Sequence, residues 1–194
     1  MSSHHFVKEG QEPAVVLVEP FSDAVAAVLE WSPLVIGLYG AIDSILINGL
    51  KADVVITPQS AREEVIKKLQ HQFPITFLHT DQSDQLHTAL QYLQTLKQYA
   101  VMIWVNDPVS YFDRVALFQN KLAISVMNAS MKWSLIKSER FTKWFASGEN
   151  LKLHGSNLVY EGLAKIDKET YRVNITGPVS ISSDQHFWIG ESLK

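Results

Sequence analysis

Four aspartates that follow short apolar runs are the residues in this sequence best suited to chemistry. Asp81 and Asp84 follow one such run, and Asp107 and Asp113 follow the next. Carboxylate oxygens are the hard ligands that Mg²⁺ prefers, so these aspartates are candidate metal ligands. Asp84 has a second interpretation, because Ser83 and Asp84 together are typical of the start of a helix. Both interpretations stay open at this point.

An alternating series of strands and helices would position these aspartates. Six runs are too short and too apolar for surface helices and fit strands that are buried on both faces. These runs are Ala14 to Val18, Leu34 to Leu38, Asp53 to Ile56, Ile75 to Leu78, Val101 to Val105 and Leu122 to Val126. The segments between them, with apolar residues at helical spacing, are Ser22 to Trp31, Ala41 to Leu50, Ser60 to Phe73, Asp84 to Tyr99 and Val109 to Asn120. Such alternation predicts an α/β fold with a mostly parallel, helix-flanked, Rossmann-like sheet.

Ligands of such sheets lie beyond the carboxyl ends of the strands. In this chain those ends are Glu19-Pro20, Tyr39-Gly40, Thr57 to Ser60, His79 to Ser83 and Asn106 to Ser110. The signal for a phosphate-binding turn at Tyr39-Gly40-Ala41 is weak, because the chain has neither G-x-G-x-x-G nor a P-loop lysine. A clean apolar stripe in the fourth helical segment predicts its buried face, formed by Leu86, Leu90, Leu93 and Leu96.

The pattern changes near residue 128, where the helical period fades and alternating runs begin. These runs are Ser130 to Lys137, Arg140 to Phe145, Leu151 to His154, Leu158 to Ala164, Tyr171 to Ile175, Val179 to Ser182 and His186 to Ile189. Glycine and proline residues punctuate them, as expected for a smaller antiparallel β-sandwich. The sequence therefore predicts two domains, an α/β domain over residues 1–127 and a β domain over residues 128–194.

Composition limits the classes of function. The 194 residues are 46% hydrophobic and carry a net charge of −3, so a large core is expected and no basic field favours nucleic acid. The chain has no cysteine, which excludes disulfides and thiolate metal sites. The N-terminus does not resemble a secretory signal, and no apolar run approaches the ~20 residues of a membrane helix. We expect a cytoplasmic protein without nucleic-acid or membrane partners.

Several short motifs repeat the order and spacing of one known family. Gly40 follows the second strand, and the segment from Ile45 to Ile56 keeps a leucine-rich helix, a turn and a strand, with Gly49 and Asp53 in register. A further motif keeps the matching residues Asp81, Gln82 and Asp84. This arrangement resembles the thiamine pyrophosphokinase family, which transfers a pyrophosphoryl group from ATP to thiamine. The resemblance covers most of the chain and is strongest between residues 34 and 93.

The chain departs from this family where the family's chemistry is concentrated. Tyr39 replaces an aspartate, and Pro58 and Ser60 stand where two acids bind the metal on the nucleotide. Thr88 replaces a lysine and Tyr111 replaces an arginine. Catalysis of phosphoryl transfer depends on positioning and on charge neutralisation by Mg²⁺ and cationic side chains. The resemblance and these losses together predict activity that is weak or absent.

The resemblance also implies roles for individual residues. Asp81, Asp84 and Asp113 would be catalytic, and Asp81 and Asp84 would bind the metal. The implied cofactor contacts are Tyr39, Gly40, Gln82, Ser110, Ser183 and Asp184. Ser183 matches a family serine near thiamine, whereas Asp184 departs in charge. A carboxylate beside the cationic thiazolium is electrostatically reasonable.

Two hypotheses follow from the sequence. In the first, the chain is a divergent enzyme that uses Mg²⁺ and ATP to make thiamine diphosphate and AMP. In the second, it is a non-catalytic protein that binds thiamine or another small heterocycle, or a dimeric interaction module. The resemblance implies a homodimer in either case.

Overall fold

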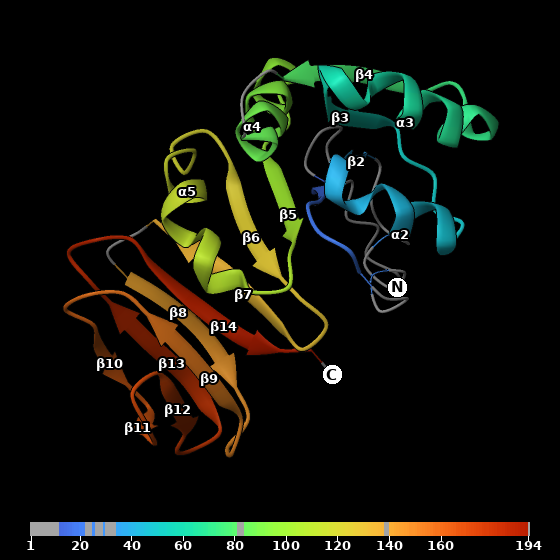
Figure 1. Ribbon diagram of the computed structural model, residues 1–194. Coiled ribbons are helices and arrows are strands. Elements are labelled where there is room, and N and C mark those ends of the chain that lie inside the picture. The colour runs from blue at the N-terminus through green and yellow to red at the C-terminus, as the bar shows by residue number, and fades with distance from the viewer. Residues whose placement is uncertain are drawn as a thin grey trace, which may run out of the picture. The chain divides into compact units, whose positions relative to one another are not determined.

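The computed structural model describes residues 12–21, 25, 29, 34–80, 84–137 and 140–193. Its contacts divide the chain into two compact units, Met1–Ala129 and Ser130–Lys194, which we call unit 1 and unit 2 (Figure 1). The sequence pattern predicts a boundary between residues 127 and 128, and the contacts place it between 129 and 130. The helix predicted over Ser22 to Trp31 lies outside the described residues except at positions 25 and 29.

Unit 1 contains a parallel sheet of short apolar strands. The strands are β1 (Ala14–Leu17), β2 (Val35–Leu38), β3 (Val54–Pro58), β4 (Thr76–Thr80), β5 (Ala100–Trp104) and β6 (Ala123–Met127). They lie in the order β6-β5-β1-β2-β3-β4, and every neighbouring pair is parallel. The central strands β1 and β2 are buried at every position, as expected for a sheet covered on both faces. The predicted α/β class is confirmed.

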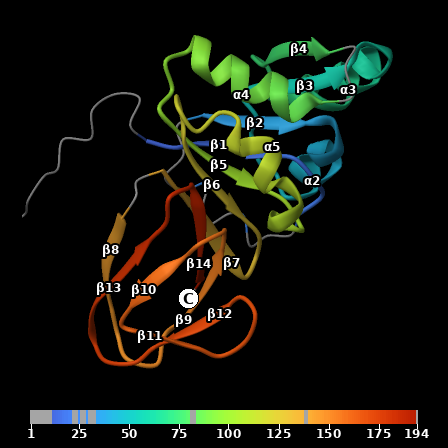
Figure 2. The same cartoon turned by 90° about the vertical axis from the view of Figure 1, so that its left-hand side faces the viewer.

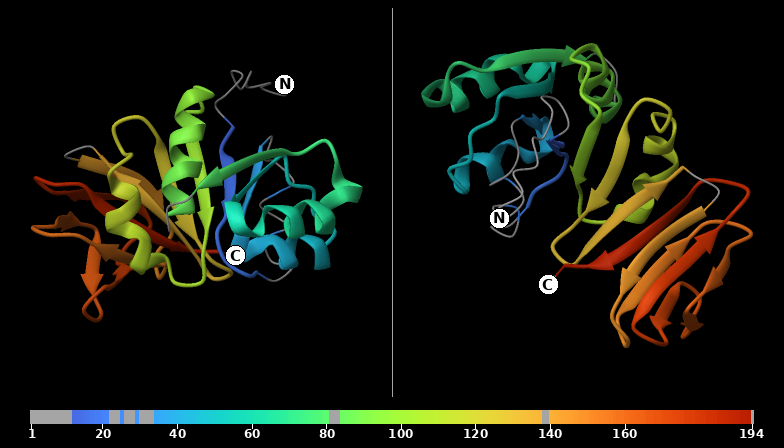
Figure 3. Two further views of the ribbon diagram at one scale, coloured as in Figure 1. Left: turned by 45° about the horizontal axis from the view of Figure 1, so that its top comes forward. Right: turned by 180° about the vertical axis from the view of Figure 1, so that it is seen from behind.

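The helices of unit 1 cover both faces of this sheet. They are α2 (Ile42–Ile47), α3 (Arg62–Leu69), α4 (Gln85–Thr95) and α5 (Phe112–Ala116). The strand order runs outward from β1 to β4 and then resumes at β5 on the other side of β1. Right-handed crossovers therefore place α2 and α3 on one face and α4 and α5 on the other, as Figure 3 shows. Accordingly, one core cluster packs Ile45 and Val65 against Val15 and Val55.

Several helices are shorter than their periodicity predicts, because their first turns are 3₁₀ helices. These turns, η2 (Tyr39–Ala41), η3 (Gln59–Ala61) and η5 (Pro108–Tyr111), directly follow strands or their connecting residues. In α4, Leu86, Leu90 and Leu93 are buried as predicted. The predicted helical segment, Asp84 to Tyr99, is too long, because α4 ends at Thr95 and Leu96 of the stripe is 47% exposed. None of the helices in the described part of the chain is long and apolar enough to span a bilayer.

Unit 2 is an antiparallel β-sandwich, as the sequence predicts. In one layer lie, in this order, β11 (Leu163–Lys165), β12 (Thr170–Val173), β9 (Asn150–His154), β14 (Phe187–Ser192) and β7 (Met131–Ile136). The other layer contains β10 (Val159–Glu161), β13 (Gly177–Ser182) and β8 (Arg140–Phe145), as Figure 2 shows. Phe187 and Ile189 of the first layer and Val179 and Ile181 of the second share one core. The single strand predicted over Leu158 to Ala164 is wrong, because the chain passes from one layer to the other between β10 and β11.

Candidate functional site

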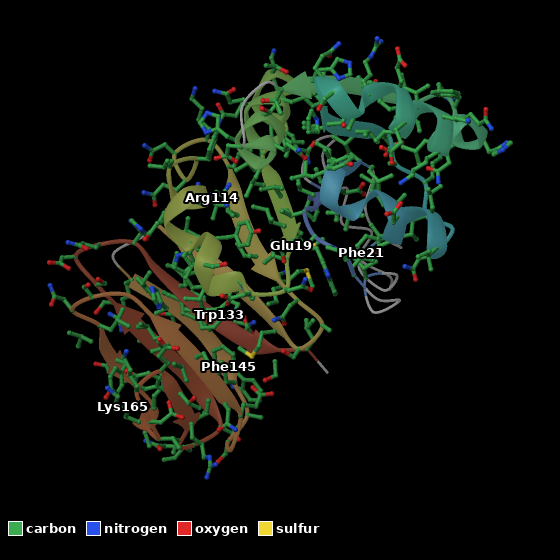
Figure 4. All side chains as sticks on the ribbon, viewed as in Figure 1. Glu19, Phe21, Arg114, Trp133, Phe145 and Lys165 are labelled. Atoms are coloured by element: carbon green, nitrogen blue, oxygen red, sulfur yellow. The ribbon has the colours of Figure 1, made fainter. Side chains whose placement is uncertain are left out.

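The strand order of unit 1 creates a switch point between β1 and β5, where ligands of doubly wound sheets bind. Glu19 follows β1 and occupies this point (Figure 4). Its Oε2 accepts a hydrogen bond of 2.6 Å from the backbone N–H of Asn106, which follows β5. A half-buried carboxylate therefore bridges the carboxyl ends of the two strands between which the topology reverses.

Tyr111 holds the second oxygen of this carboxylate. It ends the 3₁₀ turn η5, and its hydroxyl donates to Glu19 Oε1 at 2.5 Å. Burial, followed by the hydrogen bond from its hydroxyl to Glu19, raises the pKa of Tyr111 to about 12. The phenol therefore stays protonated at neutral pH and serves as a fixed donor to Glu19.

Arg114 extends this contact toward helix α4. Its guanidinium carbon lies 5.2 Å from the centre of the Tyr111 ring, and its Nη2 donates to Asp84 Oδ1 at 2.9 Å. The same oxygen of Asp84 accepts from the backbone N–H of His87 at 3.0 Å and caps α4. Glu19, Tyr111, Arg114 and Asp84 thus form a connected chain of contacts, which we call the switch-point network.

The structure places the other predicted residues of unit 1 separately. Tyr39 and Gly40 lie in η2, where the Tyr39 N–H donates to Gln85 Oε1 at 2.9 Å and the Tyr39 side chain is 40% exposed. Ser110 is exposed and donates to the carbonyl of Asp107. Asp113 is exposed on α5. Asp81 and Gln82 lie outside the described residues.

The predicted residues of unit 2 border a shallow hollow. Ser183 is 7% exposed, and its hydroxyl donates to the carbonyl of Ser156 at 2.9 Å. Asp184 is exposed and accepts from Asn157 Nδ2 at 3.4 Å. Together with Val159, these residues border a hollow of about 460 Å³ that leaves the Asp184 carboxylate accessible.

Of the two predicted metal ligands, Asp81 lies outside the described residues, and Asp84 is engaged by other protein groups. Within the described ranges, no group of three or more Asp, Glu or His side chains comes together, so no site held by protein ligands alone is present there. Both oxygens of Glu19 accept protein hydrogen bonds, and Asp84 pairs with Arg114. Magnesium usually binds through one or two carboxylates and phosphate oxygens. Asp84, the predicted metal ligand that the structure describes, already has a cationic partner in Arg114.

Sequence reasoning placed Glu19 at a strand end where ligands lie but gave it no role, missed Arg114, and treated Tyr111 only as a lost arginine. Glu19 had a usable signal, since an acid directly follows the first apolar run. Which strand ends meet depends on strand order, however, and the Tyr111–Glu19 contact joins residues 92 positions apart. Arg114 had no comparable signal, because its partner lies on another helix.

The Tyr111–Glu19 hydrogen bond leads to a prediction about alkaline stability. The Tyr111 pKa is about 12 when folded and near 10.0 when unfolded, so its stabilisation is present below pH 10 and declines as the pH approaches 12. We expect Tyr111→Phe to lower the free energy of unfolding by about 1 kcal/mol at neutral pH. The difference from wild type should shrink above pH 10, as urea denaturation at several pH values would measure.

The matched control for this prediction is Tyr99→Phe, because Tyr99 is 59% exposed. This variant removes the same hydroxyl and should leave the unfolding free energy unchanged. Equal losses in the two variants, or a Tyr111→Phe loss that does not vary with pH, would contradict the role assigned to the Glu19 contact.

Comparison with solved structures shows which known fold this architecture matches. Yeast thiamin pyrophosphokinase aligns with a TM-score of 0.71 and 9% identity over 94% of this chain and 87% of that one. The Geobacillus thermodenitrificans enzyme aligns with a TM-score of 0.66 and 10% identity over 93% and 98% of the two chains. The Candida albicans enzyme aligns with a TM-score of 0.65 and 7% identity over 95% of this chain and 90% of that one.

No protein-family model and no curated protein sequence matches the chain. The likeness is thus one of structure, extending over nearly the full length of both chains at very low sequence identity. It includes both units, the parallel sheet and the β-sandwich. The chain therefore has the fold of the thiamine pyrophosphokinases, at sequence identities of 7 to 10% to these three enzymes.

Proposed function

We propose that this chain is a thiamine pyrophosphokinase-like protein in which pyrophosphoryl transfer from ATP is strongly reduced or lost. The observation that carries the proposal is the switch-point network. Glu19 places a carboxylate at the crevice between β1 and β5, and Asp84 is engaged by Arg114. The network thereby uses for internal contacts the groups that a metal-nucleotide complex would need.

Electrostatics supports this proposal. A nucleotide triphosphate brings concentrated negative charge, which catalysis must offset with Mg²⁺ and cationic side chains. The predicted acid positions hold Tyr39, Pro58 and Ser60, and the predicted lysine position holds Thr88. Arg114 is the cation of the network, and its charge is already balanced by Asp84. An ATP phosphate near Glu19 would face a like charge, which disfavours binding.

Binding of a cationic heterocycle is the second function that we propose, and a specific observation favours it. Asp184 presents an accessible carboxylate in the hollow beside Ser183. A carboxylate there complements the positive thiazolium of thiamine, and this interaction needs neither ATP nor Mg²⁺. We therefore propose thiamine or a related cationic heterocycle as the ligand of unit 2. A homodimer stays a prediction from the family resemblance.

An AMP-release assay with thiamine, ATP and Mg²⁺ tests the loss of transfer. We expect release from the purified protein to stay at the level of a reaction without protein. Asp113→Asn should leave this background unchanged, because Asp113 is exposed on α5 and is not one of the four residues of the switch-point network. Thiamine-dependent AMP release that Asp113→Asn abolishes would refute the proposal and restore Asp113 as a catalytic residue.

Calorimetric titration with thiamine tests the binding function in the same preparation. We expect binding without Mg²⁺, and an affinity that Asp184→Asn weakens by about tenfold through loss of one charge interaction. Glu161→Gln is the matched control, since it removes an exposed carboxylate of unit 2 that does not border the hollow. Absence of thiamine binding, or equal binding by both variants, would refute the assignment to Asp184.

A further inference from the structure

A second hollow in unit 2 has the size and the chemistry of a ligand site. It measures about 610 Å³, within the range of roughly 300 to 1,000 Å³ that is common for small-molecule pockets. It lies between the turn after β9 and the turn between β11 and β12. It shares no lining residue with the hollow beside Asp184.

Two tyrosines give this hollow an aromatic wall. The rings of Tyr160 and Tyr171 meet edge to face, with centroids 4.9 Å apart and planes at 72°. Tyr171 is 5% exposed and belongs to the core of the sandwich, whereas Tyr160 packs against that core from the edge. A flat ring in the hollow could therefore contact an aromatic surface that is fixed by packing.

Two lysines give the same hollow a positive charge. Lys165, labelled in Figure 4, places its Nζ 5.8 Å from the centre of the Tyr171 ring. Lys168 lies in the turn that follows β11. Among the described carboxylates, none forms an ion pair with either lysine. Glu169, which lines the hollow, instead has its Oε1 3.8 Å from Nδ1 of His154.

The turn that carries Lys168 is held by its own hydrogen bonds. Asp167 Oδ1 accepts from the N–H groups of Glu169 and Thr170 at 2.9 and 2.7 Å. These backbone hydrogen bonds hold the pKa of Asp167 below its usual value, because they stabilise the charged carboxylate. The N–H of Leu153 also donates to the Glu169 carbonyl, which ties the turn to β9.

The opposite turn is equally fixed. Gly155 lies so close to Phe187 that an added Cβ would be 2.7 Å from the Phe187 Cβ. The next residue, Ser156, accepts the hydrogen bond from the Ser183 hydroxyl. Both walls of the hollow are therefore held by contacts independent of any ligand, which lowers the cost of ordering the site on binding.

We propose that this hollow binds a small molecule that joins a phosphate group to a flat ring. The phosphate would lie between Lys165 and Lys168, and the ring would lie against Tyr160. Lysine is a common phosphate ligand, and the two ammonium groups outnumber the single lining carboxylate. This site is distinct from the sites proposed above, because it shares no lining residue with the Asp184 hollow and none with the switch-point network, although Ser183 of the Asp184 hollow holds Ser156.

Phenyl phosphate is the probe for this proposal, added to the full-length chain and followed by amide resonances in NMR. We expect saturable shifts of the Gly155, Ser156 and Lys168 amides, with a dissociation constant of about 1 mM or tighter. Lys168→Gln should weaken binding about tenfold, and the double variant Lys165→Gln/Lys168→Gln should weaken it further. Lys121→Gln, an exposed lysine of unit 1, should leave the affinity unchanged.

Inorganic phosphate and phenol separate the two halves of the proposed ligand. Each is expected to bind more weakly than phenyl phosphate at the same amides. Inorganic phosphate that binds as tightly as phenyl phosphate would overturn the aromatic part of the site. Shifts confined to other residues, or equal affinity in the double lysine variant, would overturn the site itself. All lysine variants are at exposed or hollow-lining positions, and an unchanged amide spectrum would confirm that they fold.

Discussion

Phe112→Ala should lower the free energy of unfolding of unit 1 by about 3 to 5 kcal/mol. Phe112 is 2% exposed and is among the largest buried side chains of the chain. It is the first residue of α5, follows Tyr111 and precedes Arg114 by two positions. Truncation would leave a cavity beneath the short helix that positions both of these network residues. Urea denaturation followed by the helical circular dichroism signal would measure the loss, because the described α-helices all belong to unit 1.

Leu117→Ala is the control for this prediction. Leu117 immediately follows α5 but is 78% exposed, so its truncation removes apolar atoms beside the same helix without opening a cavity. We expect a change within about 0.5 kcal/mol for this exposed position. A loss below about 1 kcal/mol for Phe112→Ala would mean that the helix is not anchored by this side chain, and it would weaken the case for a fixed network.

The outcome of Phe112→Ala also bears on how the site is built. The Glu19–Tyr111 contact joins the end of β1 to the turn before α5, and the Arg114–Asp84 contact joins α5 to α4. Neither contact lies within a single element, so each depends on where the packing of α5 places Tyr111 and Arg114. If both contacts stabilise unit 1, the losses for Phe112→Ala and Tyr111→Phe should not add, since they act through shared partners.

The fold of unit 1 could be predicted from the sequence because each buried strand is a short run of apolar residues. The strands of unit 1 are apolar at nearly every position, so β1, β2 and β3 could be recognised from their own residues. The predicted helix end was wrong where the path of the chain, and not the local apolar pattern, decides the structure. Leu96 continues the apolar period of α4, yet the helix ends before it because the chain turns there, with Lys97 at a φ of 55°.

The candidate site was less accessible to sequence reasoning. The resemblance directed attention to Asp84, whose carboxylate does lie near the carboxyl ends of the strands. Its partner Arg114 is 30 residues away, and the pairing follows from the way α4 and α5 cover the same face of the sheet. Sequence alone could thus identify an acid without identifying the charge that balances it, although that balance decides whether the acid can serve a metal.

Gly155→Ala should destabilise unit 2 by about 2 to 4 kcal/mol, through backbone strain and a steric clash together. Gly155 has a φ of +157°, and its added Cβ would lie 2.7 Å from the Cβ and 3.3 Å from the Cα of Phe187. Phe187 is fully buried in the core, so it cannot move aside without disturbing the sandwich. Hydrogen exchange of the β14 amides would measure the effect.

Gly177→Ala separates the two causes, because Gly177 has a φ of +158° but nothing within 4 Å of its added Cβ. Gly177→Ala should lower the free energy of unfolding through strain alone, by about 1 to 3 kcal/mol. Gly155→Ala should lower it further, because its Cβ also overpacks against Phe187. Equal losses would show that the turn moves freely away from Phe187, in which case the wall of the proposed phosphate hollow is not preorganised. A larger loss at Gly155, accompanied by weaker phenyl phosphate binding, would indicate that the same contact stabilises the sandwich and shapes the hollow.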